Sequence, residues 1–236
     1  MIIGCSGWSY ADPVEKGGWT KVFYPTAQTK KLQYYSQFFN TAEMDATFYE
    51  KFYKYMTKET FSAMTNATPD DFQFSVKVPE TVTHEKRLDV NRMEFRNPSW
   101  QTEGPWDMLK HYNISAVITD SPPQDKLQFL SEVTVTADHS FIRWHGRNDK
   151  HRYNYPYSKE ELKPWVEKVK QISIESPVVR GYFNNHYGAR AVVNALEFKE
   201  MLGTVLSEKE KAALEHARNY FSETSSQLTL DKSLKQ

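Results

Sequence analysis

Cysteine is almost absent from this sequence of 236 residues. Cys5 stands alone, so the chain cannot form an internal disulfide bond, which indicates a reducing compartment. No stretch approaches the ~20 consecutive apolar residues that a membrane-spanning helix needs. No basic leader precedes an apolar run at the start of the sequence, so no signal peptide is predicted. Together these absences favour a cytoplasmic protein without a membrane partner.

A net charge is also absent, because Lys plus Arg and Asp plus Glu each total 30. Proteins that coat nucleic acids usually carry a basic excess, so nucleic acid is not the favoured partner, although a local basic patch is not excluded. No G-x-G-x-x-G or Walker loop follows any predicted strand, which weakens a nucleotide-binding doubly wound sheet. Hydrophobic residues at 39% and charged residues at 25% are typical of a globular chain.

The sequence does contain five segments in which apolar residues alternate with charged or amide residues. They span residues 41–48, 72–78, 92–96, 141–145 and 180–186. A period of two predicts strands with one apolar and one polar face. With two further segments, the predicted strands are seven, at residues 2–5, 42–48, 72–78, 92–96, 116–120, 141–145 and 178–184.

Stretches with helical periodicity lie between the predicted strands, at residues 29–39, 57–65, 104–112, 158–172, 190–202 and 206–221. The clearest is 158–172, where Ser158 and Glu161 have the spacing of a capping box. Alternating strands and helices predict a parallel sheet with right-handed crossovers. Strands buried on both faces would be continuously apolar. The polar face therefore favours a closed barrel with a polar mouth.

Several segments together resemble the YecE-like family of (β/α)-barrel proteins, whose members mostly have no assigned activity. They are IGCSGWSY (3–10), FYP (23–25), EMDATFY (43–49), FSVKVP (74–79) with TH (83–84), EFRNPSW (94–100), RWHGR (143–147), YSKEEL (157–162) and YFNNH (182–186). The resemblance runs in order from residue 1 to about residue 203. It implies a TIM-type barrel of parallel strands, formed by a single domain over residues 1–221. The polar residues 222–236 are expected to form a loose C-terminal extension.

One departure concerns the stretch between Thr83 and Glu94, where the family normally has helices and a further strand. A strand–helix unit needs roughly thirty residues, so one barrel unit is missing from this sequence. Without that unit, an eight-stranded barrel cannot close and two strand edges are exposed. Either the barrel is seven-stranded or open, or a stretch of the chain is omitted between these residues. We favour the second alternative.

Polar residues that could carry chemistry gather at the carboxyl ends of the predicted strands, where parallel barrels place their reactive groups. The set comprises Glu43, Asp45, Lys77, Glu94, Arg96, Asp120, Arg143, His145, Asn184 and His186. Glu43 and Asp45 share one face of a strand. Two such carboxylates either raise each other's pKa or bind a cation. Alternatively, each one pairs with an Arg or Lys in a structural network.

The residue types suggest acid–base catalysis with Asp45 or Glu94 as base and His145 or His186 as acid, and Glu43 as a further catalytic candidate. Lys77, Arg96 and Arg143 would form an anion clamp. Asn184 and Asp120 are further candidates for binding substrate. Trp8 and Tyr49 could form a wall that stacks on a sugar or base.

These residues suggest a hydrolase or lyase that acts on a phosphate- or sugar-containing small molecule. Whether the protein is an enzyme is left open. The alternatives are a non-catalytic binder of nucleotides or nucleic acid, and a scaffold whose inward charges only satisfy one another. A divalent metal also stays open, since the ligand types are present but H-E-x-x-H spacing is not.

Overall fold

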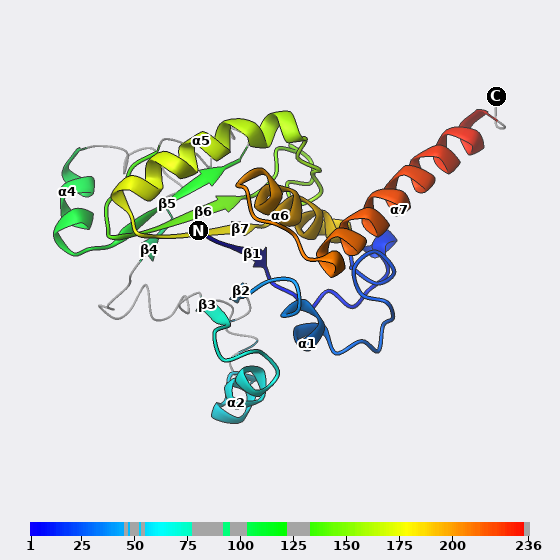
Figure 1. Cartoon of the computed structure of the whole chain (residues 1–236), viewed down its shortest axis with the longest axis horizontal. Helices are drawn as coiled ribbons and strands as arrows, with labels where there is room; N and C mark the ends of the chain where they lie inside the picture. The colour runs from blue at the N-terminus through cyan, green and yellow to red at the C-terminus, as the bar shows by residue number, and fades with distance from the viewer. Residues whose placement is uncertain are drawn as a thin grey trace.

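A computed structural model describes residues 1–44, 47, 52, 55–76, 92–94, 103–121 and 133–233. Its centre is a seven-stranded parallel sheet with the order β3-β2-β1-β7-β6-β5-β4 (Figure 1). The strands are β1 (Ile2–Ser6), β2 (Thr41–Met44), β3 (Gln73–Val76), β4 (Arg92–Met93), β5 (Ser115–Asp120), β6 (His139–Trp144) and β7 (Val178–Phe183). All seven predicted strands are therefore present, and the predicted parallel α/β fold is confirmed.

The order of the strands resembles a ring with one interruption. Strands that are consecutive in the chain also pair in the sheet, with the exception of β3 and β4, and β7 pairs with β1. The interruption lies between β3 and β4, which form the two edges of the described sheet. Residues 77–91, where a barrel unit is predicted to be missing, lie outside the described residues. The full sequence is nevertheless continuous there, so the prediction that a stretch of the chain is omitted between Thr83 and Glu94 is wrong.

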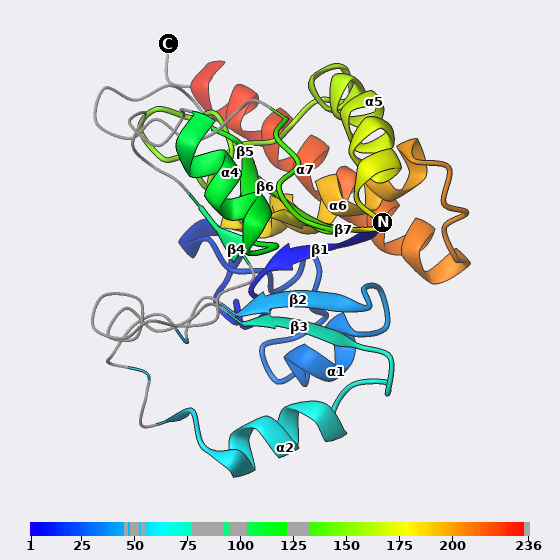
Figure 2. The same ribbon diagram turned by 90° about the vertical axis from the view of Figure 1, so that its left-hand side faces the viewer.

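The sheet is strongly curled. Glu43 of β2 and Arg92 of β4 form an ion pair of 3.2 Å, although five strand spacings separate their strands in the sheet order. In a flat sheet those spacings would add up to roughly 24 Å, beyond the reach of the two side chains. The strands therefore form a half-barrel, with β2 and β3 in one half and β4 to β7 in the other (Figure 2).

The helices begin within two residues of their predicted starts, but the first ends at residue 35 rather than 39. They are α1 (Lys31–Tyr35), α2 (Lys58–Asn66), α4 (Glu103–His111), α5 (Lys159–Glu175), α6 (Arg190–Met201) and α7 (Glu208–Ser233), with short 3-10 turns η1 (Val14–Lys16) and η5 (Tyr187–Ala189). Helix α7 continues past the predicted end at residue 221 and extends away from the sheet (Figure 1). The boundary between a domain at 1–221 and a tail at 222–236 stays a prediction.

Helix α5 shows how local sequence produces an element here. The predicted capping box is confirmed: Ser158 Oγ accepts the Glu161 N–H, and the Glu161 carboxylate accepts the Ser158 N–H. These bonds satisfy two donors that the first helical turn otherwise leaves unpaired. The residues at helical spacing on one face are buried, namely Leu162, Trp165, Val166, Val169 and Ile172. That face packs the helix against the sheet.

The main core lies between the outer face of the sheet and the helices, and large aromatic side chains dominate it. Trp144 of β6 stacks on Phe183 of β7, with ring centroids 4.5 Å apart. Trp165 of α5 and Phe198 of α6 meet the Trp144 ring edge-on. The aromatic richness of the sequence thus serves packing between helices and sheet. Within the described residues, we find no helix with both the length and the apolar character to cross a membrane.

Candidate functional site

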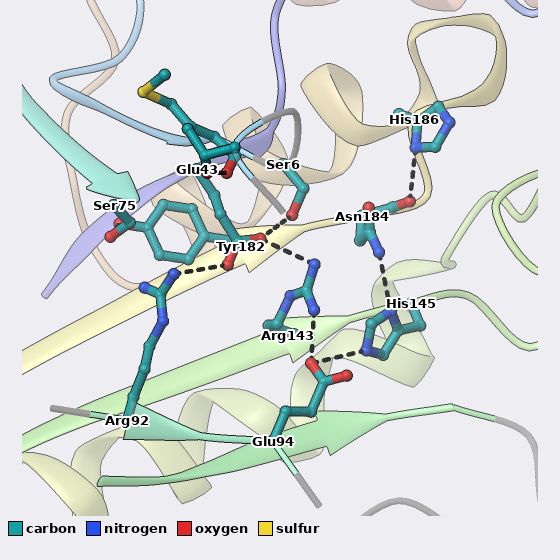
Figure 3. Close-up of polar contacts among 12 residues, drawn as sticks. Ser6, Glu43, Ser75, Arg92, Glu94, Arg143, His145, Tyr182, Asn184 and His186 are labelled. Carbon is teal, nitrogen blue, oxygen red and sulfur yellow. Dashed lines mark hydrogen bonds and ion pairs between the residues drawn. The ribbon is translucent and has the colours of Figure 1, made fainter. Parts of the chain in front are cut away.

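The inner face of the curled sheet carries polar side chains from several strands. Arg143 of β6 stands beside Tyr182 of β7 in the register, and Glu43 of β2 stands beside Ser75 of β3. His145 and Asn184, which directly follow β6 and β7, continue the hydrogen-bond ladder of the sheet. The His145 N–H donates to Asp120 O and the Asn184 N–H donates to Trp144 O, both at 2.8 Å. Alternation along each strand therefore brings a polar cluster to the inner face (Figure 3).

Glu43 lies at the centre of a buried ion-pair network. Its side chain is 2% exposed. Its Oε2 accepts from Ser6 Oγ at 2.7 Å and lies 2.9 Å from Arg143 Nη2, while Arg92 Nη2 contacts Oε1. Burial alone would raise the pKa of Glu43, but the two guanidinium groups and Ser6 outweigh burial and lower this pKa. For Glu43, the geometry agrees with the structural-network alternative.

Glu94 connects this network to His145. Glu94 Oε2 lies 2.5 Å from Arg143 Nη1 and 3.5 Å from His145 Nε2 (Figure 3). Its side chain is 12% exposed, against 2% for Glu43 and 2% for His145. Arg143 thus bridges two carboxylates, and Glu94 is the more accessible of them.

His145 is held from its other side by Asn184, whose Nδ2 lies 2.9 Å from His145 Nδ1. Both residues are buried. Burial lowers the pKa of His145, and the positive charge of Arg143 acts in the same direction against the opposing effect of Glu94. The imidazole is therefore neutral at pH 7 and makes contacts through both ring nitrogens.

Asp120 does not belong to this cluster, although it ends β5. It is paired in the register with Trp144 and so lies on the outer face of the sheet. Its carboxylate accepts two hydrogen bonds from Arg147, at 2.8 and 2.6 Å, and one each from Tyr157 and Trp165. Four donors on one carboxylate anchor α5 and the loop after β6 to the sheet. This placement supports a structural role for Asp120.

His186 lies beyond Asn184 in an aromatic stack. Its ring is between Tyr10 and Tyr153, with centroid separations of 4.7 and 4.9 Å, and its Nδ1 contacts Asn184 O at 3.1 Å. Burial lowers the pKa of His186 to about 4. Trp8 packs against Phe74. His186 therefore lies beside the cluster (Figure 3), whereas Trp8 packs against the hydrophobic core.

The remaining predicted site residues, Asp45, Tyr49, Lys77 and Arg96, lie outside the described residues, so their roles stay predictions. Sequence reasoning also missed members of the cluster. Arg92 occupies the same alternating face as Glu94 and could have been selected from that spacing alone. Ser6 and Tyr182 could not, because one small hydroxyl residue or one tyrosine in a strand is too common to carry a signal. Tyr182 Oη bonds Ser75 and Thr41 beneath the ion pairs.

For a metal ion, the described residues offer no group of three or more His, Cys, Asp and Glu side chains in ligand geometry. Within the cluster, Glu43 and Glu94 are both engaged by Arg143. A guanidinium group between two carboxylates takes the position that a cation would need. The cluster formed by the described residues is thus suited to acid–base chemistry rather than to metal ligation.

Two solved structures resemble this one over most of its length. A DUF72 family protein from Thermotoga maritima MSB8 is 26% identical, with a TM-score of 0.69 over 86% of this chain and 98% of that chain. A DUF72 family protein from Enterococcus faecalis V583 is 20% identical, with a TM-score of 0.66 over 87% of this chain and 96% of that chain. No curated protein matches the chain significantly.

A family model described as "Protein of unknown function DUF72" matches residues 2–93 and 91–217. The two matched stretches overlap at residues 91–93, within the stretch between Thr83 and Glu94 where a barrel unit is predicted to be missing. The resemblance to YecE-like proteins is confirmed. Because this family model matches most of the chain, the chain belongs to the DUF72 family.

Proposed function

We propose that this protein is an enzyme of the hydrolase or lyase type, with its active site at the C-terminal mouth of a (β/α) barrel. The half-barrel, the pairing of β7 with β1 and the likeness to the Thermotoga protein support the barrel. In barrels of this kind, catalytic residues stand at the carboxyl ends of the strands. Glu94 follows β4 and His145 follows β6, so both occupy that position.

The observation that carries the proposal is the contact of Glu94 Oε2 with His145 Nε2 at 3.5 Å. A carboxylate and an imidazole in contact can move a proton to and from a bound substrate. The two groups follow different strands. Each is fixed by a further contact, Glu94 by the ion pair with Arg143 and His145 by the hydrogen bond with Asn184. Groups fixed in this way need little reorganisation during a reaction.

In this scheme Arg143 positions Glu94, because both of its terminal nitrogens already contact carboxylates. The role of anion clamp then falls to Lys77 and Arg96, which the sequence places on the same polar face. A phosphate group, or the hydroxyl groups of a sugar, would suit such a clamp beside Glu94. The substrate we propose is therefore a small phosphate- or sugar-containing molecule.

The experiment that tests this proposal is a ligand screen followed by a hydrolysis assay. Thermal unfolding is measured with phosphorylated sugars, nucleotides and short oligonucleotides, each with and without divalent cations. A ligand present at a hundred times its dissociation constant stabilises the fold by roughly 2.7 kcal/mol. Ligands that stabilise the protein are then incubated with it, and their cleavage products are measured.

Glu94→Gln should retain the ligand-induced stabilisation and lose turnover by a factor of about 100 or more, because it removes the base without changing the shape. The matched control is Glu197→Gln. Glu197 of α6 has a side chain of similar exposure, 11%, and pairs with Arg218 of α7, outside the cluster. Equal turnover in wild type and Glu94→Gln would contradict the proposal. Binding of oligonucleotides that weakens steeply with salt, without cleavage, would instead support the non-catalytic alternative.

A further inference from the structure

Asn184 is held in place by three hydrogen bonds that fix both its backbone and its side chain. Its N–H donates to Trp144 O at 2.8 Å, and its carbonyl oxygen contacts His186 Nδ1 at 3.1 Å. Its side-chain Nδ2 lies 2.9 Å from His145 Nδ1. Since an amide nitrogen can only donate, Nδ1 of His145 must accept and carries no proton.

The contact of the other ring nitrogen, Nε2, with Glu94 favours the same tautomer of His145. A neutral imidazole has one proton, which must then lie on Nε2. Nε2 faces Glu94 Oε2, which is an acceptor. If the Asn184 amide were reversed, its oxygen would take the proton to Nδ1, and a bare Nε2 would face the carboxylate. A doubly protonated ring would instead bring an N–H against the Asn184 amide hydrogens. Both contacts are therefore favourable in one protonation state, the neutral Nε2–H tautomer.

We propose that Asn184 is a positioning residue that holds His145 as the Nε2–H tautomer, so that His145 donates a hydrogen bond to substrate and Glu94 is the base. The catalytic part of this inference rests on the proposed function, whereas the tautomer does not. The partner of Nε2–H is an oxygen acceptor of the substrate, such as a carbonyl, glycosidic or phosphoester oxygen. Asn184, expected from the sequence to bind substrate, thus acts through His145.

The test is NMR of the imidazole nitrogens in the full-length protein labelled with ¹⁵N-histidine, without ligand. The chain has seven histidines, so His145→Gln identifies the signal of His145 by its loss. At pH 7 the wild type should show a protonated Nε2 and an unprotonated Nδ1. Asn184→Asp places a carboxylate acceptor at Nδ1, which should move the proton to Nδ1 and raise the pKa of His145. The control Asn219→Asp adds the same charge on the exposed side of α7 and should leave the His145 signal unchanged.

A wild-type His145 protonated at Nδ1, or at both nitrogens, would overturn the inference at pH 7. The same holds if Asn184→Asp folds and keeps the Nε2–H tautomer. The wild-type spectrum decides the question even if Asn184→Asp does not fold. Failure of the proposed function would appear elsewhere, as full turnover in Glu94→Gln, and would leave the tautomer of His145 unaffected.

Discussion

Arg143 is the residue on which the buried cluster most depends, because its guanidinium group compensates two carboxylates at once. Among the described residues, Arg143→Met would leave Glu43 with Arg92 and Ser6 as partners, and would remove the guanidinium group that contacts Glu94 at 2.5 Å. Removing one partner of a buried ion pair typically costs about 3–5 kcal/mol. We expect a loss of that size in the free energy of unfolding, measured by urea denaturation.

The matched control is Arg218→Met, since Arg218 also bonds a glutamate but is 44% exposed. Its loss should cost about 1 kcal/mol or less. Adding Glu43→Gln to Arg143→Met should recover part of the lost stability, because the uncompensated carboxylate is then gone. A loss from Arg143→Met no larger than that from Arg218→Met would contradict the buried network.

His186 should make the fold sensitive to acid. Its pKa is lowered by burial to about 4, from an ordinary value of 6.5. Above pH 6.5 the ring is neutral in both the folded and the unfolded chain, so its contribution is constant. Between pH 6.5 and 4 the unfolded chain binds a proton that the folded chain does not. The free energy of unfolding therefore decreases as the pH is lowered through this range, by about 3 kcal/mol in all.

His186→Phe keeps an aromatic ring in the stack and cannot titrate. The variant should therefore show a flatter dependence of unfolding free energy on pH between 6.5 and 4, measured by denaturation at each pH. Some dependence should remain, because burial lowers the pKa of His145 as well. His111→Phe on the exposed end of α4 is the control. An unchanged slope in His186→Phe would show that His186 is not the source of the acid sensitivity.

At the scale of the element, α5 offers a test of how local sequence determines structure. Ser158→Ala removes the hydroxyl oxygen that accepts the Glu161 N–H and leaves that donor without its cap. Loss of an N-cap side chain costs about 1 kcal/mol, within a range of about 0.5–2. Thermal and urea unfolding should show this loss, whereas Ser173→Ala on the exposed face of the same helix should change stability by less than about 0.5 kcal/mol. Equal effects would contradict a role for the cap.

The elements could be predicted because their signals are local. Alternation identified five of the seven described strands, and the spacing of Ser158 and Glu161 identified the start of α5. The same alternation predicted that Glu43, Glu94 and Arg143 share a face. It could not predict that Asp120 faces the helices, because residues at strand ends were selected by position without regard to the face. The register that pairs Asp120 with Trp144 decides this, and register depends on contacts between strands far apart in the sequence.

The ion-pair partners within the cluster could not be predicted from the sequence, for a related reason. Which arginine meets Glu43 depends on how strongly the sheet curls. Curling brings Arg92 of β4 to Glu43 of β2 across the inner face. Alternation within one strand carries no information on that distance. The burial that lowers the pKa of His186 likewise arises from Tyr10 and Tyr153, which are distant in sequence.

For the whole molecule, the decisive prediction concerns the closure of the barrel. The described strands follow one another around the curled sheet, and β7 returns to β1, so the order leaves a place for one strand between β3 and β4. The family match divides at residues 91–93, beside that place. An added strand there would pair with both edges and close the barrel, which removes two exposed edges.

The sequence of 236 residues leaves too few residues between Thr83 and Glu94 for a strand–helix unit, which needs roughly thirty. We therefore expect the sheet to be open at β3 and β4, with the cluster around Glu94 beside an unpaired strand edge, where exposure to water weakens its ion pairs. The backbone amides of β3 and β4 should then exchange with deuterium faster than those of the central strands β1 and β7, measured by hydrogen-exchange mass spectrometry. Equally slow exchange in the edge strands and the central strands would contradict an open sheet.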